Sequence, residues 1–191
     1  MSTKYKVRDP DKCYFITVTV VEWIDLFTRF NHRNTIIDSL SYCQKHKGLE
    51  IYAYVIMPSH IHLMCRSEEG HHLSDIIRDF KKFTSKRLIE NILKEPESRR
   101  EWLIERFKKA CSHLRKGMHF KVWQDGYHGE EVSSNKFIYQ KLDYIHKNPV
   151  AERLVQKPED YLFSSARNYA DLDSVLEVFL IPHKPVFMHR I

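Results

Sequence analysis

The chain has few glycines, few cysteines and no long apolar run. Only five of its 191 residues are glycine, and no G-x-x-x-x-G-K-[ST] loop occurs, so no phosphate loop of a nucleotide-fuelled enzyme is predicted. The cysteines Cys13, Cys43, Cys65 and Cys111 never form a C-x-x-C pair, which argues against a zinc ribbon or a redox pair. We expect them to be core thiols in a reducing cytosol.

We also expect no targeting segment. Residues 1–11 are polar and charged, and no stretch approaches the roughly 18 apolar residues of a membrane span. We therefore expect a cytoplasmic protein without a membrane segment. Hydrophobic residues make up 42% of the chain and aromatic residues 13%, which is enough for a buried core. The length favours one domain over residues 1–191 rather than two very small ones.

The charge is moderately basic. Lys and Arg number 31 against 25 Asp and Glu, which gives a formal charge of +6 and a pI near 9.1. Long-range attraction then favours a polyanion, and nucleic acid is the first candidate. Many soluble proteins carry this much charge, so the balance supports nucleic-acid binding without establishing it.

The first half of the chain is predicted to fold in the order strand, helix, strand, strand (β, α, β, β). Aromatic and β-branched residues predict a strand over residues 13–21, and apolar residues at helical spacing predict a helix over residues 31–47 that ends at Gly48. Two further strands are predicted over residues 51–57 and 60–66, with Pro58 and Ser59 between them.

A long helix follows. Ser74 is its predicted cap and Pro96 its predicted end. Its apolar stripe consists of Ile76, Ile77, Phe80, Phe83, Leu88 and Ile92. Residues 97–116 read as an extra charged helix that carries Trp102, Leu103, Phe107 and Leu114. We interpret this segment as an insertion, and its pattern indicates no function.

The last third is predicted to hold a strand, a helix and a tail. Residues 118–124 read as the fourth strand, residues 125–129 as a loop, and a helix runs from Asn135 until Pro149 stops it. Apolar residues between 160 and 180 should pack back on a core of about residues 13–170, whereas the tail from 171 to 191 is expected to be held loosely towards its end.

These elements predict an α+β fold. The order fits a ferredoxin-like split β-α-β sandwich with one antiparallel sheet and helices on one face, extended by the helical insertion and a C-terminal helix. Such a fold carries no function by itself.

Two histidines form the first candidate site. Side chains alternate across a strand, so His60 and His62 project to one face while Ile61 points to the other. Neighbouring imidazoles on an open sheet face could bind a metal or a phosphate. Two surface histidines, in a chain with 12, are an equally good interpretation of the spacing alone.

A tyrosine on the last helix forms the second candidate site. Ile138, Leu142 and Ile145 share the stripe that should be buried, so Tyr144 lies off it. Asn148 stands one turn from Tyr144. Lys141 and Lys147 flank the phenol by three residues on each side and could hold a phosphate. An amphipathic tyrosine at a core edge explains the same pattern.

Taken together, the two motifs resemble a known family. YVIMPSHIH at residues 54–62 and YIHKNPV at residues 144–150 resemble the single-tyrosine HUH transposases of the IS200-like kind, especially the REP-associated tyrosine transposases. YFIT at 14–17, WQ at 123–124 and FSS at 163–165 extend the match over most of residues 14–169.

The resemblance implies roles for individual residues. His60 and His62 would bind a divalent metal, with Asn148 as a third polar ligand, and Tyr144 would attack DNA. Imidazole and amide ligands that leave open positions suit Mg²⁺ or Mn²⁺ in catalysis, although nitrogen ligands bind zinc more tightly. The substrate would be single-stranded DNA next to a hairpin. A homodimer, with the tyrosine acting in cis or in trans, stays open.

The chain departs from the family pattern in three places. Arg153 stands where the family often has glycine. The loop over residues 125–129 does not align with the family pattern, so His128 is only a candidate neighbour of the site. Residues 97–116 have no clear counterpart in the family.

Basic and aromatic side chains are the predicted DNA contacts, because single strands bind to basic grooves with stacking platforms. The candidates are Lys81, Lys82, Lys86, Arg87, Trp123, Gln124, Tyr127, Lys141 and Lys147. For any one of them, a solvated helix flank or an ordinary core aromatic is an equally good interpretation.

Other functions remain open. A ferredoxin-like module could bind DNA or RNA without catalysis, as in a domesticated transposase. A relaxase or replication initiator would share the metal and the tyrosine, and a metal-dependent hydrolase would use His60 and His62 with water. Covalent capture of DNA on Tyr144 distinguishes the transposase from the first and the last of these.

Overall fold

The structure, a computed structural model, describes residues 12–111 and 119–182. Predictions that concern residues 1–11, 112–118 and 183–191 lie outside this part of the chain. The elements of the first half are β1 (Tyr14–Thr19), a short 3-10 turn η2 (Val21–Trp23), α1 (Phe30–Lys47), β2 (Leu49–Ile56) and β3 (His60–Ser67). They confirm the predicted order β, α, β, β.

The second half contains most of the helices. Its elements are α2 (Leu73–Lys94), α3 (Arg100–Lys109), β4 (His128–Glu131), α4 (Asn135–Ala151), a 3-10 turn η3 (Pro158–Asp160) and α5 (Ala166–Tyr169).

One antiparallel sheet organises the molecule. Its strand order is β2-β3-β1-β4, and both β1 and β2 run antiparallel to β3. β1 and β2 are therefore parallel to each other with β3 between them, which is the predicted split β-α-β arrangement. The α+β, ferredoxin-like prediction is confirmed.

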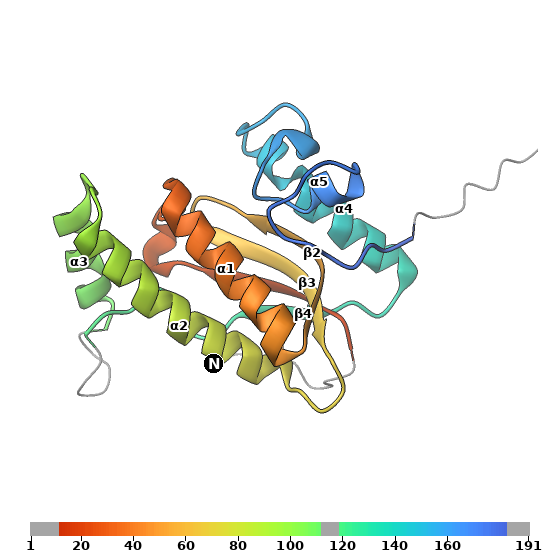
Figure 1. Cartoon of the computed structure of the whole chain (residues 1–191), viewed down its shortest axis with the longest axis horizontal. Helices are drawn as coiled ribbons and strands as arrows, with labels where there is room; N and C mark the ends of the chain where they lie inside the picture. The colour runs from red at the N-terminus through yellow and green to blue at the C-terminus, as the bar shows by residue number, and fades with distance from the viewer. Residues whose placement is uncertain (1–11, 112–118, 183–191) are drawn as a thin grey trace, which may run out of the picture.

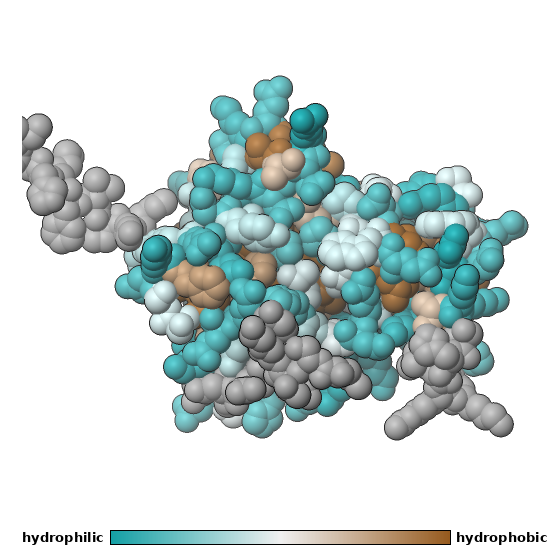
Figure 2. All heavy atoms as spheres, turned by 180° about the vertical axis from the view of Figure 1, so that it is seen from behind, coloured by the Kyte–Doolittle hydropathy of each residue, from teal (hydrophilic) through white to brown (hydrophobic). Residues whose placement is uncertain are grey.

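Helices cover both faces of this sheet. Figure 1 shows α1 and α2 side by side across one face. α4 lies over β2 and β3 on the other face, where Tyr144 contacts His62. The prediction of helices on one face is therefore wrong, because residues 61–65 of β3 are buried on both faces. Figure 2 shows the molecule from the side opposite to α1 and α2, where apolar surface forms separate patches among hydrophilic residues.

The fourth strand lies later than predicted. Of the predicted strand over 118–124, the described residues 119–124 form only an isolated bridge, between Val20 and Trp123. The strand is β4, which begins at His128 within the predicted loop over 125–129 and ends beyond it at Glu131, and it pairs with β1 at the sheet edge. Its sequence, HGEE, is polar because an edge strand is exposed on one side, so it lacks the apolar signal of an inner strand.

Two helix predictions need correction. α2 begins at Leu73 after His72, so Ser74 lies inside the helix rather than at its cap, and Phe83 is 55% exposed rather than buried. α4 continues through Pro149 to Ala151. Proline lacks only its own N–H donor, and near the end of the helix this loss is small. The predicted ends at Gly48 and before Pro96 are confirmed.

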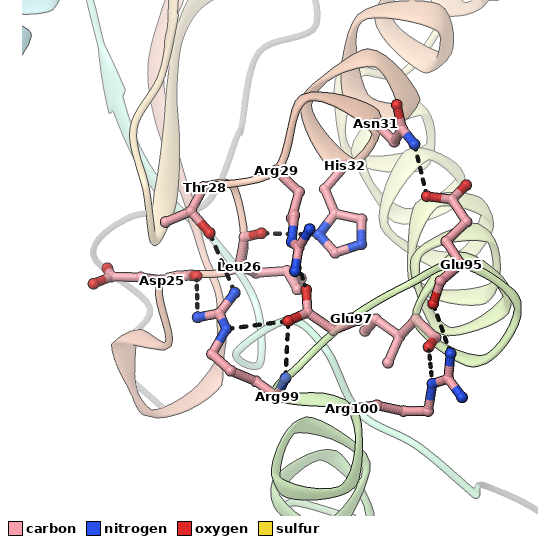
Figure 3. A network of polar contacts seen from close by, with 11 residues as sticks. Asp25, Leu26, Thr28, Arg29, Asn31, His32, Glu95, Glu97, Arg99 and Arg100 are labelled. Atoms are coloured by element: carbon pink, nitrogen blue, oxygen red, sulfur yellow. Dashed lines mark hydrogen bonds and ion pairs between the residues drawn. The ribbon is translucent and has the colours of Figure 1, made fainter.

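α3 is fastened to the loop between β1 and α1. Its Leu103 and Phe107 are buried, whereas Trp102 is 43% exposed. In Figure 3 the carboxylate of Glu97 accepts hydrogen bonds from Arg29 and Arg99, at 3.2 and 3.4 Å. The insertion is therefore part of the folded unit over its described residues.

The remaining expectations concern thiols, the tail and membranes. Cys43, Cys65 and Cys111 are buried and Cys13 is half-buried, and none is in a disulfide. The tail packs back as predicted, because Leu176 is buried and Phe179 N donates to the β2 carbonyl of Ile51 at 2.9 Å. Within the described residues, no helix is long and apolar enough to cross a membrane.

Candidate active site

The pairing of β1 with β3 builds the histidine face. In the antiparallel register Thr17 lies opposite His62, and Thr19 lies opposite His60. Because side chains directly opposite each other share a face, both threonines stand beside the histidines. The predicted projection of His60 and His62 to one face is confirmed, since their ring centroids are 4.7 Å apart.

His62 is the buried member of the pair. It is 4% exposed, its ring stacks on Phe15 at 5.3 Å, and its Nδ1 lies 2.9 Å from Thr17 Oγ1. Its Nε2 is buried and has no hydrogen-bond partner among the described residues. Burial lowers the pKa of His62 to about 3, so the imidazole is neutral at neutral pH. A neutral ring with one unpaired nitrogen has the form that a metal ligand requires.

His60 is more accessible and lies at the rim. Its Nδ1 is 3.1 Å from Ser59 Oγ, and its ring meets the edge of Trp23 at 5.4 Å. Burial lowers the pKa of His60, against the raising effect of the Glu152 and Asp25 carboxylates. The ring is therefore also neutral at neutral pH.

α4 brings Tyr144 to the same face. The ring centroids of Tyr144 and His62 are 5.2 Å apart, and Phe15 packs against the tyrosine at 5.7 Å. Tyr144 nevertheless keeps 48% of its surface exposed, so a substrate can reach it. The predicted buried stripe is confirmed for Ile145. Asn148, half-buried, follows one turn after Tyr144 on the same helix.

A hydrogen-bonded chain anchors α4 to the sheet. Ser165 Oγ donates to Tyr54 O at 3.2 Å and accepts from Tyr54 N at 2.9 Å. Since the hydroxyl proton is engaged, His146 Nε2, at 2.9 Å, must be the donor to this oxygen. Burial lowers the pKa of His146 to about 4. The anchor fixes the turn of α4 that also carries Tyr144.

Lys141 places a cation close to the tyrosine. Its Nζ is 2.6 Å from Glu130 on β4, and it lies 4.2 Å above the Phe15 ring and 6.0 Å above the Tyr144 ring. Hydrogen bonds from Lys141, which has the larger effect, and from His128 lower the pKa of Glu130. Lys147, by contrast, is exposed and pairs with Asp143 at 2.6 Å.

The basic residues of α2 lie away from this site. Lys82, Lys86 and Arg87 are exposed on the helix that covers the other face of the sheet. Lys81 is tied to the chain, because its Nζ donates to the carbonyls of Gln124, at 2.8 Å, and Gly126. Burial lowers the pKa of Lys81 to about 8.

The aromatic candidates between the motifs are also largely enclosed. Trp123 is 4% exposed, and its Nε1 donates to Thr84 Oγ1 at 3.0 Å. Gln124 donates through its backbone N to Thr19 O at 2.9 Å, and Tyr127 is half-buried against the core. Of the predicted DNA contacts, only Lys141 therefore lies against Tyr144 itself.

Sequence reasoning missed several neighbours of the histidines. Phe15 and Thr17 lie on the YFIT segment, but their roles depend on the register between β1 and β3, which no local pattern reveals. Alternation along 14–19 could have placed Phe15 and Thr17 on one face. Trp23 and Ser59 gave no signal beyond their closeness to strand ends.

The arrangement combines two neutral imidazoles with an accessible phenol on one sheet face. Within residues 12–111 and 119–182, no three or more His, Cys, Asp or Glu side chains lie together as a metal-binding group. The ligand set predicted from sequence has only two such side chains, since its third member is the amide of an asparagine. A helix tyrosine beside a histidine pair on such a sheet is the arrangement that the resemblance to the single-tyrosine transposases implies.

The family follows from the sequence match. Residues 13–148 match the family model described as "Transposase IS200 like". This match spans well over half of the chain, which belongs to the IS200-like transposase family.

One solved structure supports the fold. A REP-associated tyrosine transposase bound to a REP hairpin is similar over 100% of this chain and 99% of its own, with a TM-score of 0.63 and 20% identity. A protein from Deinococcus radiodurans R1 assigned as a transposase matches 73% of this chain and 94% of its own, with a TM-score of 0.42 and 19% identity. No curated protein matches the chain significantly.

Proposed function

We propose that the chain cleaves and rejoins single-stranded DNA through a covalent bond to Tyr144. The observation that carries this proposal is the contact between Tyr144 and His62, whose rings are 5.2 Å apart on one sheet face. The nucleophile and the predicted metal ligands belong to the same chain. This supports a tyrosine that acts in cis and a site held in one domain; a homodimer is not required.

The residues fit a divalent cation. His62 Nε2 is buried without a partner among the described residues, and Thr17 Oγ1 is positioned to accept a hydrogen bond from Nδ1–H. A proton on Nδ1 leaves the Nε2 lone pair free for a metal. His60, His62 and Asn148 would hold Mg²⁺ or Mn²⁺, which when bound would polarise the scissile phosphate and stabilise charge on its oxygens.

Tyr144 supplies the nucleophile. The phenol oxygen forms a bond to phosphorus and releases its proton, while the bond from phosphorus to the 3′ oxygen breaks and that oxygen takes up a proton. The products are a 5′-phosphotyrosine and a 3′-hydroxyl. One phosphodiester has replaced another, so the step is reversible and needs no nucleotide. Lys141, above the Phe15 and Tyr144 rings, is placed to attract the phosphate.

DNA is the proposed partner. The similar structure of a REP-associated tyrosine transposase is bound to a REP hairpin, and the formal charge of +6 favours a polyanion. We infer a hairpin with a single-stranded flank as substrate. Binding should weaken steeply with salt because counterions are released; an affinity unchanged between low and moderate salt would argue against this account.

Covalent capture tests the proposal. A labelled hairpin oligonucleotide with a single-stranded flank is incubated with protein and Mn²⁺, and a slowly migrating adduct is expected on a denaturing gel. Tyr144→Phe should abolish the adduct and retain DNA binding. Tyr139→Phe, on the same helix, is the matched control and should form it. An adduct with Tyr144→Phe, or cleavage without any adduct, would contradict the proposal.

A further inference from the structure

A cleft lies beside the histidine site. It has a volume of about 460 Å³ and is lined by Glu22, Trp23, Ile24, Asp25, Arg99, Trp102 and Arg106. η2 forms one wall and α3 the other, so residues 22–25 and the insertion face each other across it. None of these residues has a part in the proposed strand cleavage.

Hydrogen bonds join the two sides of the cleft at its base. Arg99 donates to Asp25 O at 3.0 Å and to Thr28 Oγ1 at 3.2 Å, and it also contacts Glu97 (Figure 3). The Glu97 side chain is only 3% exposed between Arg29 and Arg99. These contacts hold α3 against the loop that follows η2, so the cleft exists before any ligand binds.

Two indoles stand exposed on the walls. Trp23 is 59% exposed and Trp102 is 43% exposed, although tryptophan is normally well buried. Glu22 and Trp23 have φ of 54° and 55°, which is a strained conformation for a bulky residue. Two backbone hydrogen bonds stabilise this strained turn. Trp23 N donates to Val20 O at 3.1 Å, and Val21 N donates to Val122 O at 2.9 Å. The fold thus keeps the Trp23 ring out of the core.

Trp23 links the cleft to the proposed active site. The Trp23 ring meets the edge of the His60 ring at 5.4 Å, so Trp23 borders both. A DNA strand whose phosphate reaches His60 would extend past Trp23.

The charges in the cleft suit a nucleotide. Arg106 lies 5.7 Å above the Trp102 ring, and its Nη1 is 3.4 Å from Glu22 Oε2. This ion pair is exposed and therefore weak, so Arg106 can exchange Glu22 for a phosphate. The carboxylates of Glu22 and Asp25 can accept hydrogen bonds from exocyclic amino groups of a base. Aromatic faces with one available cation are the usual elements of a single-strand site.

We propose that this cleft binds an unpaired nucleotide of the DNA strand that enters the His60 site. The base stacks on Trp102 or Trp23, and its phosphate pairs with Arg106. The inference rests on the proposed function for the identity of the strand. It gives the insertion α3 a role, namely to complete a subsite for the single-stranded flank of a hairpin.

Binding without cleavage tests the subsite. In a Tyr144→Phe background without metal, affinities are measured for a blunt hairpin and for the same hairpin with a short single-stranded flank. Trp102→Ala should weaken binding of the flanked hairpin by roughly tenfold and leave the blunt hairpin unchanged. Trp102→Phe should retain most of the affinity because it keeps a stacking face. Phe83→Ala, which also truncates an exposed aromatic residue, is the control and should bind both as before.

Two further readouts distinguish the subsite from other occupants. The flanked hairpin should quench tryptophan fluorescence, and Trp102→Ala should remove part of that quenching, since Trp123 is buried. Arg106→Ala should reduce the slope of log affinity against log salt by about one. Equal affinities of Trp102→Ala and its parent for both hairpins, or equal losses on both, would overturn the inference and indicate a protein partner or a structural role.

The two proposals can fail separately. A flank-dependent defect in Trp102→Ala, together with no adduct from the unmodified chain, would support the subsite and refute the cleavage chemistry. Adduct formation with no flank-dependent defect would do the reverse.

Discussion

Thr17 should control metal affinity without touching metal or DNA. Its Oγ1 lies 2.9 Å from His62 Nδ1 and is the hydrogen-bond partner of that nitrogen. Loss of such a support to a metal-bound histidine costs about 10- to 100-fold in affinity, or roughly 1.4 to 2.7 kcal/mol. Thr17→Val removes the hydroxyl at almost constant shape and suits a strand, so the fold should be retained.

The assay is a Mn²⁺ titration of adduct formation. Thr17→Val should need about 10- to 100-fold more Mn²⁺ for half-maximal adduct, with hairpin affinity unchanged in the absence of metal. Thr19→Val makes the same change on the same strand face, opposite His60, and should titrate like the unmodified chain. If Thr17→Val has the same Mn²⁺ dependence as the unmodified chain, the reasoning on the His62 tautomer is refuted.

Three further predictions concern the fold. Arg153 has φ of 58°, so Arg153→Val should destabilise the chain by about 1–2 kcal/mol and Arg153→Gly should not; equal melting temperatures of both variants would contradict this. Trp123→Phe should lower stability by about 1–3 kcal/mol through loss of the bond to Thr84 and leave hairpin affinity unchanged, whereas weaker binding would restore Trp123 as a DNA contact. Lys81 has a pKa of about 8 in the fold, below its value of 10.5 in the unfolded chain. Between pH 8 and 10.5 the folded state therefore binds fewer protons, and the free energy of unfolding should rise by up to about 3 kcal/mol. Urea unfolding of Lys81→Met should lack this rise, and the same rise in that variant would exclude Lys81 as its source.

Local patterns predicted how the side chains of the candidate site are oriented on their own elements. The spacing of His60 and His62 on a strand requires a shared face, and the stripe through Ile145 requires Tyr144 to lie off the core. Both follow from the period of a single element. Neither pattern predicts that the helix with Tyr144 contacts the strand with His62. That contact was expected only from the resemblance to a family.

Features that depend on distant pairing were not predictable. The contact between Thr17 and His62 needs the register of β1 against β3, and β4 is polar because it is an edge strand. An aromatic residue in a motif also does not reveal its exposure: Trp123 lies in the core, whereas Trp23 is held at the surface by a turn without glycine. In each case tertiary contacts decide the outcome.

The most direct test of the central claim is to identify the residue that becomes linked to DNA. The adduct formed with Mn²⁺ and a flanked hairpin is trimmed with nuclease, digested with protease and analysed by tandem mass spectrometry. We predict one modified peptide, with the nucleotide mass on Tyr144. A nucleotide on any other residue, with Tyr144 unmodified, would contradict the account.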